Sequence, residues 1–114
     1  MVRKKDGGWR MCVDYRRLNF VTKLNLFPLP RLYEALDAFG GATVFSSFDL
    51  AIAYHQVTVK PLDVEKTAFI THVGHFEMQK MPFGLCNVPS TYQRLMAGVL
   101  QGLIGRICLA YLEM

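Results

Sequence analysis

The sequence has no apolar run long enough to cross a membrane, no internal repeat and no low-complexity tract. Its most apolar stretch, residues 102–112, has about half of the roughly 20 residues that a spanning helix needs, and it contains Arg106. A signal peptide would have an apolar run after its basic residues, but here the basic residues after Met1 are followed by Asp6-Gly7-Gly8. We therefore expect an intracellular protein, in the cytoplasm or nucleus, with no membrane partner.

Cysteine is also scarce, and its three positions are scattered. Cys12, Cys86 and Cys108 fit neither a disulfide framework nor a metal-site spacing. His72 and His75 form an H-x-x-H pair, but they flank an expected hairpin turn and have no third ligand nearby, so we do not expect zinc.

Apolar residues, by contrast, are abundant: they make up 52% of the 114 residues, and the net charge is +4. A chain of this length is one domain or part of one. Its apolar content predicts exposed surface that another part would normally cover. The positive charge is concentrated in residues 3–23 and suits a polyanionic partner.

The pattern of residues predicts alternating short strands and helices. A turn at Asp6-Gly7-Gly8 separates a basic segment from a strand at residues 9–15. Further strands are expected at 43–50, 56–59, 68–72, 75–80 and 106–112, with a hairpin closed around Val73-Gly74. Helices are expected from Pro30 to Phe39 and, after Asn87 as N-cap, through Leu103. This order predicts an α+β fold, with helices packed on one side of a mainly antiparallel sheet.

Two of the expected strands end in an acidic residue. Asp49 closes one strand and Glu113 follows the last one. Two carboxylates at one sheet edge would suit Mg²⁺, which takes one or two carboxylates together with substrate phosphates. Two such ions could polarise an attacking hydroxyl and a leaving phosphate oxygen. The alternative is that Asp49 only caps the turn at Ala51.

A series of motifs resembles the reverse transcriptases of gypsy-type LTR retrotransposons, in the same order and over essentially the whole chain. The motifs are residues 2–19, Pro28-Leu29-Pro30-Arg31, Phe48-Asp49-Leu50, Tyr54-His55-Gln56, Lys66-Thr67-Ala68-Phe69, Gly74-His75-Phe76-Glu77, Met81-Pro82-Phe83-Gly84-Leu85, Asn87 with Pro89, and Gln93-Arg94-Leu95-Met96. Tyr111-Leu112-Glu113-Met114 stands where the family has Tyr-x-Asp-Asp.

The resemblance implies the fingers and part of the palm of a right-hand polymerase. The fingers would be residues 1–40 and about 60–85, and the palm about 41–60 and 86–114, with the chain ending at the catalytic hairpin. The implied activity is that of an RNA-directed DNA polymerase, which transfers a nucleotidyl group from a dNTP to a primer 3′-hydroxyl with two Mg²⁺ or Mn²⁺ ions. The implied partners are an RNA or DNA template–primer, a dNTP, and the absent palm, thumb and RNase H portion or a dimer partner.

The resemblance also implies roles for single residues. Asp49 would hold both metal ions, helped by the backbone carbonyl of Leu50 and by Glu113. The remaining residues would bind the nucleotide (Lys4, Arg10, Leu50, Tyr54, Phe83 and Gly84) or the template (Lys5, Asp14 and Arg16). Lys4 and Arg10 would grip the triphosphate, and Tyr54 would crowd a 2′-hydroxyl. On the residues alone, the two cations could equally be a solvated basic face, Tyr54 and Phe83 could be core, and His55 is expected to be structural.

The chain departs from the family at its end. Glu113 replaces the first Asp of the pair and moves the carboxylate outward, and a misplacement of about 1 Å can cost on the order of a hundredfold in rate. Met114 replaces the second Asp, and a thioether is a poor Mg²⁺ ligand. One lost base would explain both changes and a following stop codon. We therefore expect the chain to be inactive or nearly so. A non-catalytic nucleic-acid-binding remnant and a retrotransposon pseudogene product are the alternatives.

Overall fold

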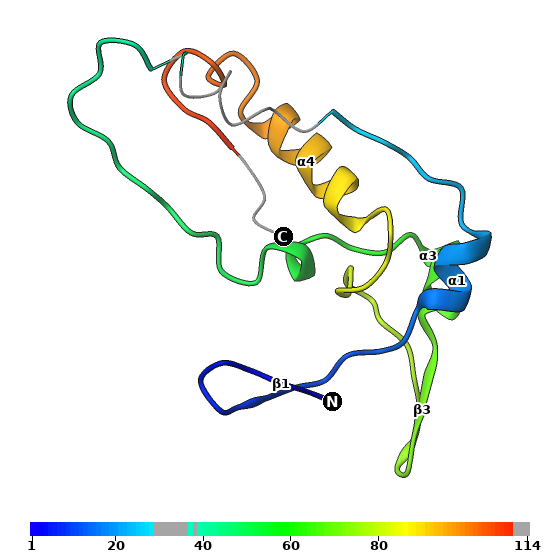
Figure 1. Cartoon of the computed structure of the whole chain (residues 1–114). Coiled ribbons are helices and arrows are strands. Elements are labelled where there is room, and N and C mark those ends of the chain that lie inside the picture. Colours follow the sequence, from blue (N-terminus) through cyan, green and yellow to red (C-terminus); the bar gives the residue numbers. More distant parts are fainter. Residues whose placement is uncertain (29–36, 38, 111–114) are drawn as a thin grey trace. The chain divides into compact units, whose positions relative to one another are not determined.

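The computed structural model describes residues 1–28, 37 and 39–110, and it divides into two units. The first unit comprises Met1–Leu24 and Ile52–Val88, and the second comprises Asn25–Ala51 and Pro89–Met114. Each is considered by itself below, and Figure 1 shows the course of the chain.

The first unit opens with the basic hairpin that the sequence predicts. Strand β1 (Val2–Arg3) pairs antiparallel with β2 (Trp9–Arg10). The turn is closed by the Lys4 amide, which donates to the Gly8 carbonyl at 2.7 Å, while Gly7 takes a left-handed φ of 85°. The predicted strand at 9–15 was too long: among the described residues, 11–15 have no strand partner, and an extended segment without one forms no ladder.

A short helix and a helical turn form the centre of the first unit. Helix α1 spans Arg16–Val21, and α3 (Pro61–Val64) begins with proline in its first turn and continues into the 3₁₀ helix η2 (Glu65–Thr67). The buried Thr67 joins them, because its carbonyl accepts the hydroxyl of the buried Tyr15 at 3.1 Å. The Thr67 hydroxyl in turn donates to the Val64 carbonyl at 2.6 Å and accepts the Met78 amide at 2.8 Å.

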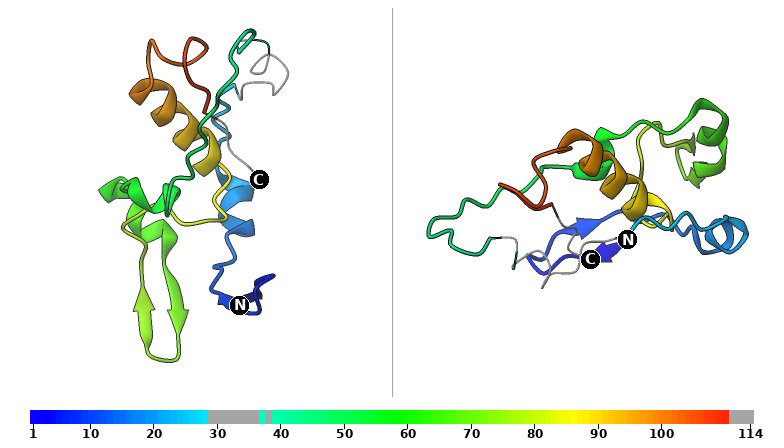
Figure 2. Two further views of the ribbon diagram at one scale, coloured as in Figure 1. Left: turned by 90° about the vertical axis from the view of Figure 1, so that its left-hand side faces the viewer. Right: turned by 90° about the horizontal axis from the view of Figure 1, so that it is seen from above.

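A second hairpin leaves this centre, as the left panel of Figure 2 shows. Strand β3 (Phe69–Thr71) pairs with β4 (Gly74–Phe76), and Thr71 lies opposite Gly74. The turn therefore falls on His72-Val73, one residue before the predicted position, because Gly74 with a φ of 143° opens the return strand.

The predicted strand at 56–59 was wrong over most of its length. Ala53–Gln56 form a 3₁₀ helix, η1, which follows Ile52 in a left-handed conformation. Only Thr58 bridges to another segment, at Lys80, with flanking hydrogen bonds from the Val59 amide to the Gln79 carbonyl and from the Met81 amide to the Val57 carbonyl.

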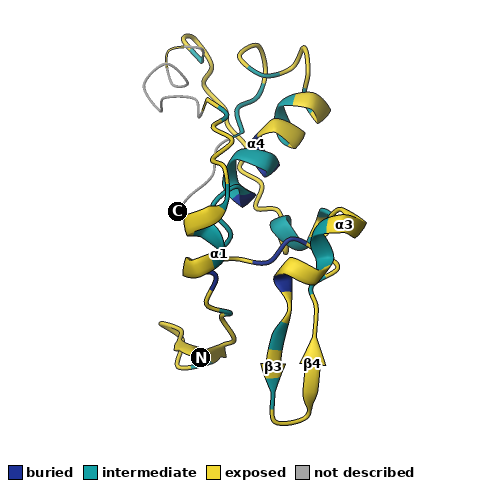
Figure 3. Cartoon of the chain, turned by 90° about the vertical axis from the view of Figure 1, so that its right-hand side faces the viewer, coloured by how far each residue is buried: buried dark blue, intermediate teal, exposed yellow. Residues whose placement is uncertain are grey.

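The second unit holds nearly all of the longest described helix, α4 (Val88–Val99). The sequence predicts a helix here, but the predicted continuation through Leu103 is wrong, because residues 100–103 form a turn in which Gly102 has a left-handed φ of 81°. Tyr92 and Gln93 are buried on it, whereas Leu95 and Val99 are exposed. Figure 3 shows that α4 carries both buried and exposed stretches. The helix predicted from Pro30 to Phe39 lies mostly outside the described residues.

The two strands that were to carry the acidic residues are not strands in the described part of the chain. Residues 43–50 have no regular secondary structure and are exposed throughout. Residues 105–107 form a turn, an isolated bridge joins Ile104 to Cys108, and residues 109–110 have no regular structure. Gly102 and Gly105 have left-handed φ values. A β-strand persists only where its backbone groups find a partner, and neither of these two segments pairs with a described strand.

The α+β class and the antiparallel pairing are confirmed, but the described strands form two separate two-stranded sheets rather than one sheet with helices on one side. The expected exposure of apolar surface is also confirmed. Few apolar side chains are buried, among them Tyr15, Met81, Val88 and Tyr92, while many large ones, such as Phe20 and Phe48, are exposed. No described helix is long and apolar enough to span a bilayer.

Candidate active site

Two rings and one guanidinium group surround the Phe83 ring in the first unit. The Phe83 ring centroid lies 5.2 Å from that of Tyr54 and 5.4 Å from that of His55, which meets it edge-on at 81°. The Arg10 guanidinium carbon lies 5.5 Å from the same centroid, within cation–π range. The cluster therefore joins strand β2, the 3₁₀ helix η1 and the loop at residues 81–87, and it unites three predicted nucleotide-binding residues: Arg10, Tyr54 and Phe83.

The loop that carries Phe83 is held by one side chain from α1. The Asn19 amide nitrogen donates to the Gly84 carbonyl at 2.7 Å, and its oxygen accepts the Cys86 amide at 2.9 Å. The Asn19 side chain thus satisfies the backbone acceptor just before Leu85 and the backbone donor just after it. Because an Asn in a helix is not favoured by propensity, its presence at this position is explained by these two bonds.

The backbone conformation at position 84 requires a glycine. Its φ is +97°, a conformation that costs an L-residue roughly 1–2 kcal/mol. A Cβ atom here would lie 3.5 Å from the Tyr15 ring. The turn after Phe83 therefore depends on the absence of a side chain, which also leaves the backbone open to close approach by a ligand.

The predicted cations of the basic hairpin have different surroundings. Lys4 is exposed, and its Nζ lies 4.0 Å from Asp6 Oδ2, at the limit of an ion pair. Lys5 is exposed in the turn and has no ion pair with any described residue. The hairpin therefore offers positive charge that is only partly neutralised within the described chain.

The predicted template-binding residues, Asp14 and Arg16, form an ion pair with each other. The Arg16 guanidinium donates to both carboxylate oxygens, at 2.6 Å to Oδ2 and 2.9 Å to Oδ1, and the Arg16 backbone amide donates to Oδ1 at 3.0 Å. The hydrogen bonds from Arg16 lower the pKa of Asp14 from 3.8 to about 2. The same interaction raises the pKa of Arg16. This pairing was not predicted, although an Asp two residues before an Arg at a helix start is a recognisable local signal.

The predicted metal ligands belong to the second unit. Asp49 and Leu50 are exposed in the segment without regular structure, and Glu113 and Met114 lie outside the described residues. An exposed carboxylate such as Asp49 suits Mg²⁺ as a single oxygen ligand. Within the described residues, however, no three His, Cys, Asp or Glu side chains gather into a group that could hold a metal.

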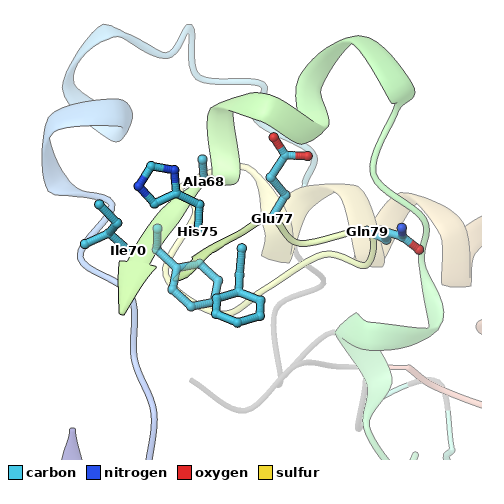
Figure 4. Close-up of a pocket in the computed structure, with 7 residues that line it drawn as sticks. Ala68, Ile70, His75, Glu77 and Gln79 are labelled. Atoms are coloured by element: carbon cyan, nitrogen blue, oxygen red, sulfur yellow. The ribbon is translucent and has the colours of Figure 1, made fainter. Parts of the chain in front are cut away.

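The β3–β4 hairpin carries a shallow pocket of its own, drawn in Figure 4. Ala68, Ile70, His75, Glu77 and Gln79 line it, together with Phe69 and Phe76, whose rings stack 5.9 Å apart. None of the predicted nucleotide-binding residues lines this pocket. His72 lies in the hairpin turn itself.

Two residues near the site were missed from the sequence. Asn19 carries the loop, and His55 packs against Phe83 although it was expected only to be structural. The contacts of Asn19 cross 65 and 67 positions in the sequence, so no local pattern could have revealed them.

Comparison with known proteins places the chain in a family. Residues 2–112 match the family model described as Reverse transcriptase (RNA-dependent DNA polymerase). The chain is 41% identical, over 92% of its length, to the Retrovirus-related Pol polyprotein from transposon 297 of Drosophila melanogaster, and 38% identical, over 91%, to that from transposon gypsy. It spans only 10% of each of these polyproteins.

A shorter relative and a solved structure agree. The chain is 40% identical to the RNA-directed DNA polymerase homolog of Oenothera berteroana, covering 91% of this chain and 73% of that protein. The crystal structure of the Prototype Foamy Virus Protease-Reverse Transcriptase is similar in fold, with a TM-score of 0.69 and 24% identity over 90% of this chain and 14% of that one. The chain therefore belongs to the reverse transcriptase family.

Proposed function

We propose that the chain is the nucleotide-binding and template-binding part of an RNA-directed DNA polymerase of the gypsy type. Members of the family in general depend on divalent metal ions and bind a template–primer and a dNTP. The observation that carries the proposal is the cluster of Arg10, Tyr54 and Phe83, three residues from distant parts of the sequence that meet at one place.

Each of the proposed nucleotide-binding residues has its own task. Lys4 and Arg10 bind the triphosphate, Lys4 as a point charge and Arg10 by its planar fork. The Phe83 ring lies against the Arg10 guanidinium and limits its movement, which lowers the entropy that Arg10 loses on binding phosphate. Tyr54 packs against the same ring and faces the sugar, where its bulk excludes a 2′-hydroxyl. The backbone of Gly84, which carries no side chain, would let the nucleotide approach closely.

The template is bound by a second set of side chains: Lys5, Asp14 and Arg16. The bidentate pair of Asp14 with Arg16 supports this role, because it fixes a polar group and a guanidinium at the start of α1. Arg16 retains donors beyond those that Asp14 occupies, and these are free to reach a phosphate oxygen.

The catalytic metal ions would be held by Asp49, the Leu50 carbonyl and Glu113. Bound there, two Mg²⁺ or Mn²⁺ ions would supply charge stabilisation for nucleotidyl transfer. Asp49 keeps the carboxylate that the family needs, whereas Glu113 is longer by a methylene and Met114 offers no oxygen. We infer that this chain by itself does not carry out the reaction at a useful rate.

Equilibrium binding of a fluorescent nucleotide, mant-dGTP, tests the nucleotide site without requiring catalysis. Arg10→Gln should weaken binding by about tenfold or more, since a hydrogen bond to a charged group contributes roughly 1.5–3 kcal/mol. Arg3→Gln is the matched control, because it removes the same charge from the same hairpin but lies outside the Phe83 cluster. Equal losses in the two variants would mean that only the net charge of the hairpin matters.

Primer extension tests the inferred lack of activity. The chain should give no extension above background with Mg²⁺ or Mn²⁺ on an RNA template with an annealed primer. Synthesis that disappears in Asp49→Asn would overturn this part of the proposal.

A non-catalytic role in nucleic-acid binding is the second candidate, and the exposed basic hairpin favours it. It predicts salt-dependent RNA binding that is lost when Lys4, Lys5 and Arg10 are changed together, with no binding of mant-dGTP. The nucleotide titration thus separates the two functions.

A further inference from the structure

The basic hairpin has two different faces, and only one belongs to the site described above. In an antiparallel pair, residues directly opposite each other have their side chains on the same face, and successive residues alternate between faces. Val2 is opposite Arg10, and Arg3 is opposite Trp9. Arg10, which lies over Phe83, therefore shares one face with Val2, while Arg3 and Trp9 share the other.

The Arg3–Trp9 face carries the exposed ring of Trp9 beside the positive charge of Arg3. Trp9 is 64% exposed, and no aromatic contact with a described ring involves it. Arg3 is exposed and has no ion pair with any described residue, and the same holds for Lys5 in the adjoining turn. The other charges near the turn are engaged: Lys4 lies by Asp6, and Arg10 by Phe83.

An exposed indole between free cations is poorly explained by the fold of this hairpin. Leaving a tryptophan in water forgoes the favourable burial of a large apolar surface. Single-stranded nucleic acid has the complementary chemistry, because its bases stack on aromatic rings and its phosphates pair with cations. The charge on this face selects a polyanion over an apolar protein surface.

We propose that the Arg3–Trp9 face of the hairpin binds an unpaired stretch of RNA or DNA, with a base stacked on Trp9 and phosphates bound by Arg3 and Lys5. The site is separate from the triphosphate residues, since Arg10 is on the opposite face. It rests on the proposed function only in taking a nucleic-acid strand as ligand, and it adds a stacking contact that is indifferent to base sequence.

Tryptophan fluorescence reads this contact directly, because Trp9 is the single tryptophan of the chain. The probes are oligo(U) and oligo(dT) of about ten nucleotides, a length within the range that one single-strand-binding module covers. An abasic sugar–phosphate strand of equal length is the control for charge. We expect both oligonucleotides to quench Trp9 emission at saturation and the abasic strand to leave it unchanged. Binding of a labelled strand that leaves Trp9 emission unchanged would overturn the proposal.

Variants test the energetic importance of the face. Trp9→Leu should weaken binding of labelled oligo(dT) about tenfold, whereas Trp9→Phe, which keeps a ring, should retain most of the affinity. Arg3→Gln should lower the slope of log affinity against log salt concentration by about 0.7, the value for one phosphate contact on a single strand. Val2→Thr, on the opposite face, is the matched control and should bind as the parent chain does.

The outcomes separate this inference from the proposed function. Trp9→Leu should bind mant-dGTP like the parent chain, because it leaves the Arg10 face intact. If Trp9→Leu binds oligo(dT) as tightly as the parent while Arg10→Gln loses mant-dGTP, the stacking site is refuted and the nucleotide site stands. If the chain binds no oligonucleotide but still binds mant-dGTP, the stacking site is again refuted.

Discussion

The two units differ in how many of their functional residues are fixed by contacts with other residues. In the first unit, Phe83 meets Arg10, Tyr54 and His55, and Asn19 holds the loop from two sides. In the second unit, Asp49 lies in a fully exposed segment without regular structure. The proposed nucleotide-binding residues Arg10, Tyr54 and Phe83 are thus fixed by contacts within the first unit, whereas Asp49, the proposed metal ligand, has no comparable support in the described residues.

This difference follows from the kind of structure that each function uses. A turn, a hairpin or a loop clamped by one amide is completed by contacts within a short, closed set of residues. A sheet edge that aligns carboxylates needs neighbouring strands over its whole length. The segment 43–50 is rich in apolar residues suited to a strand, including Val44, Phe45 and Phe48, yet no described strand pairs with it.

The largest expected contrast between the units is in amide hydrogen exchange. Among the described residues, no backbone amide of 43–50 donates a hydrogen bond, whereas the amides of Val59, Met78 and Met81 do. We expect the latter three to exchange at least about a hundredfold more slowly than residues 43–50, because exchange at a bonded amide requires local opening. Exchange measured by NMR or mass spectrometry checks this. Equal protection in the two sets would mean that residues 43–50 are paired in solution.

The next largest effect is expected at Asn19. Asn19→Ala removes two hydrogen bonds to the loop and should lower the free energy of unfolding by about 2 kcal/mol, at roughly 1 kcal/mol for each bond. It should also weaken binding of mant-dGTP, because Phe83 and Gly84 lose their support. Urea denaturation and the nucleotide titration measure the two effects.

Asn25 provides the matched control in the second unit. Its side-chain oxygen accepts a hydrogen bond from Arg94 at 2.8 Å. Asn25→Ala removes the bond to Arg94 and should leave nucleotide binding unchanged, because Asn25 is not one of the proposed nucleotide-binding residues. If both variants impair nucleotide binding to the same extent, the clamp at Asn19 is not specific to the site.

A smaller effect is expected at Gly84. Gly84→Ala places a Cβ atom on a backbone with a φ of +97° and should cost about 1–2 kcal/mol. Gly41 has a similar φ of +91°, but it lies beside the exposed segment 43–50, and an added Cβ atom would have nothing within 4 Å. There the backbone can relax, so Gly41→Ala should stay within about 0.5 kcal/mol of the parent chain in urea denaturation. Equal costs at both sites would remove this distinction between the units.

Local sequence signals predicted those parts of the fold that are completed locally. Asp6-Gly7-Gly8 marked the first turn, and the apolar spacing after Asn87 marked α4, since the conformations of turns and helices depend on neighbours in the sequence. The prediction of a strand at 43–50 was wrong because the apolar content of a segment shows that it can pair with another strand, not that such a partner is present. The turn at His72-Val73 was displaced by one residue because the predicted position ignored which side of the turn Gly74 would occupy.

The site was predicted from the family pattern rather than from physical chemistry alone. Arg10, Tyr54 and Phe83 could be read from their motifs, and the structure brings them together. The two hydrogen bonds between Asn19 and the loop could not be predicted from the sequence, because they depend on which loop lies beside α1. The functional roles of all these residues, Asp49 and Glu113 included, remain predictions that rest on the resemblance.

The smallest expected effect concerns the pH response of Asp14 at the start of α1. Its pKa is lowered from 3.8 to about 2, chiefly by the hydrogen bonds from Arg16. A carboxyl group with a lowered pKa in the folded state stabilises the fold above its ordinary pKa, and this stabilisation is lost as the pH falls from about 4 towards 2. Because the pair is exposed, the change in stability should be small.

The carboxyl carbon shift of Asp14 in an NMR titration follows this ionisation directly. In the parent chain the midpoint should lie near pH 2, and in Arg16→Gln it should rise towards 3.8, since the donors of the guanidinium are lost. Asp63, whose pKa is lowered by Lys66, is the internal control and should titrate alike in both chains. An Asp14 midpoint that does not move in Arg16→Gln would show that the pair does not persist in solution, and the proposed fixing of Arg16 for template binding would then lose its support.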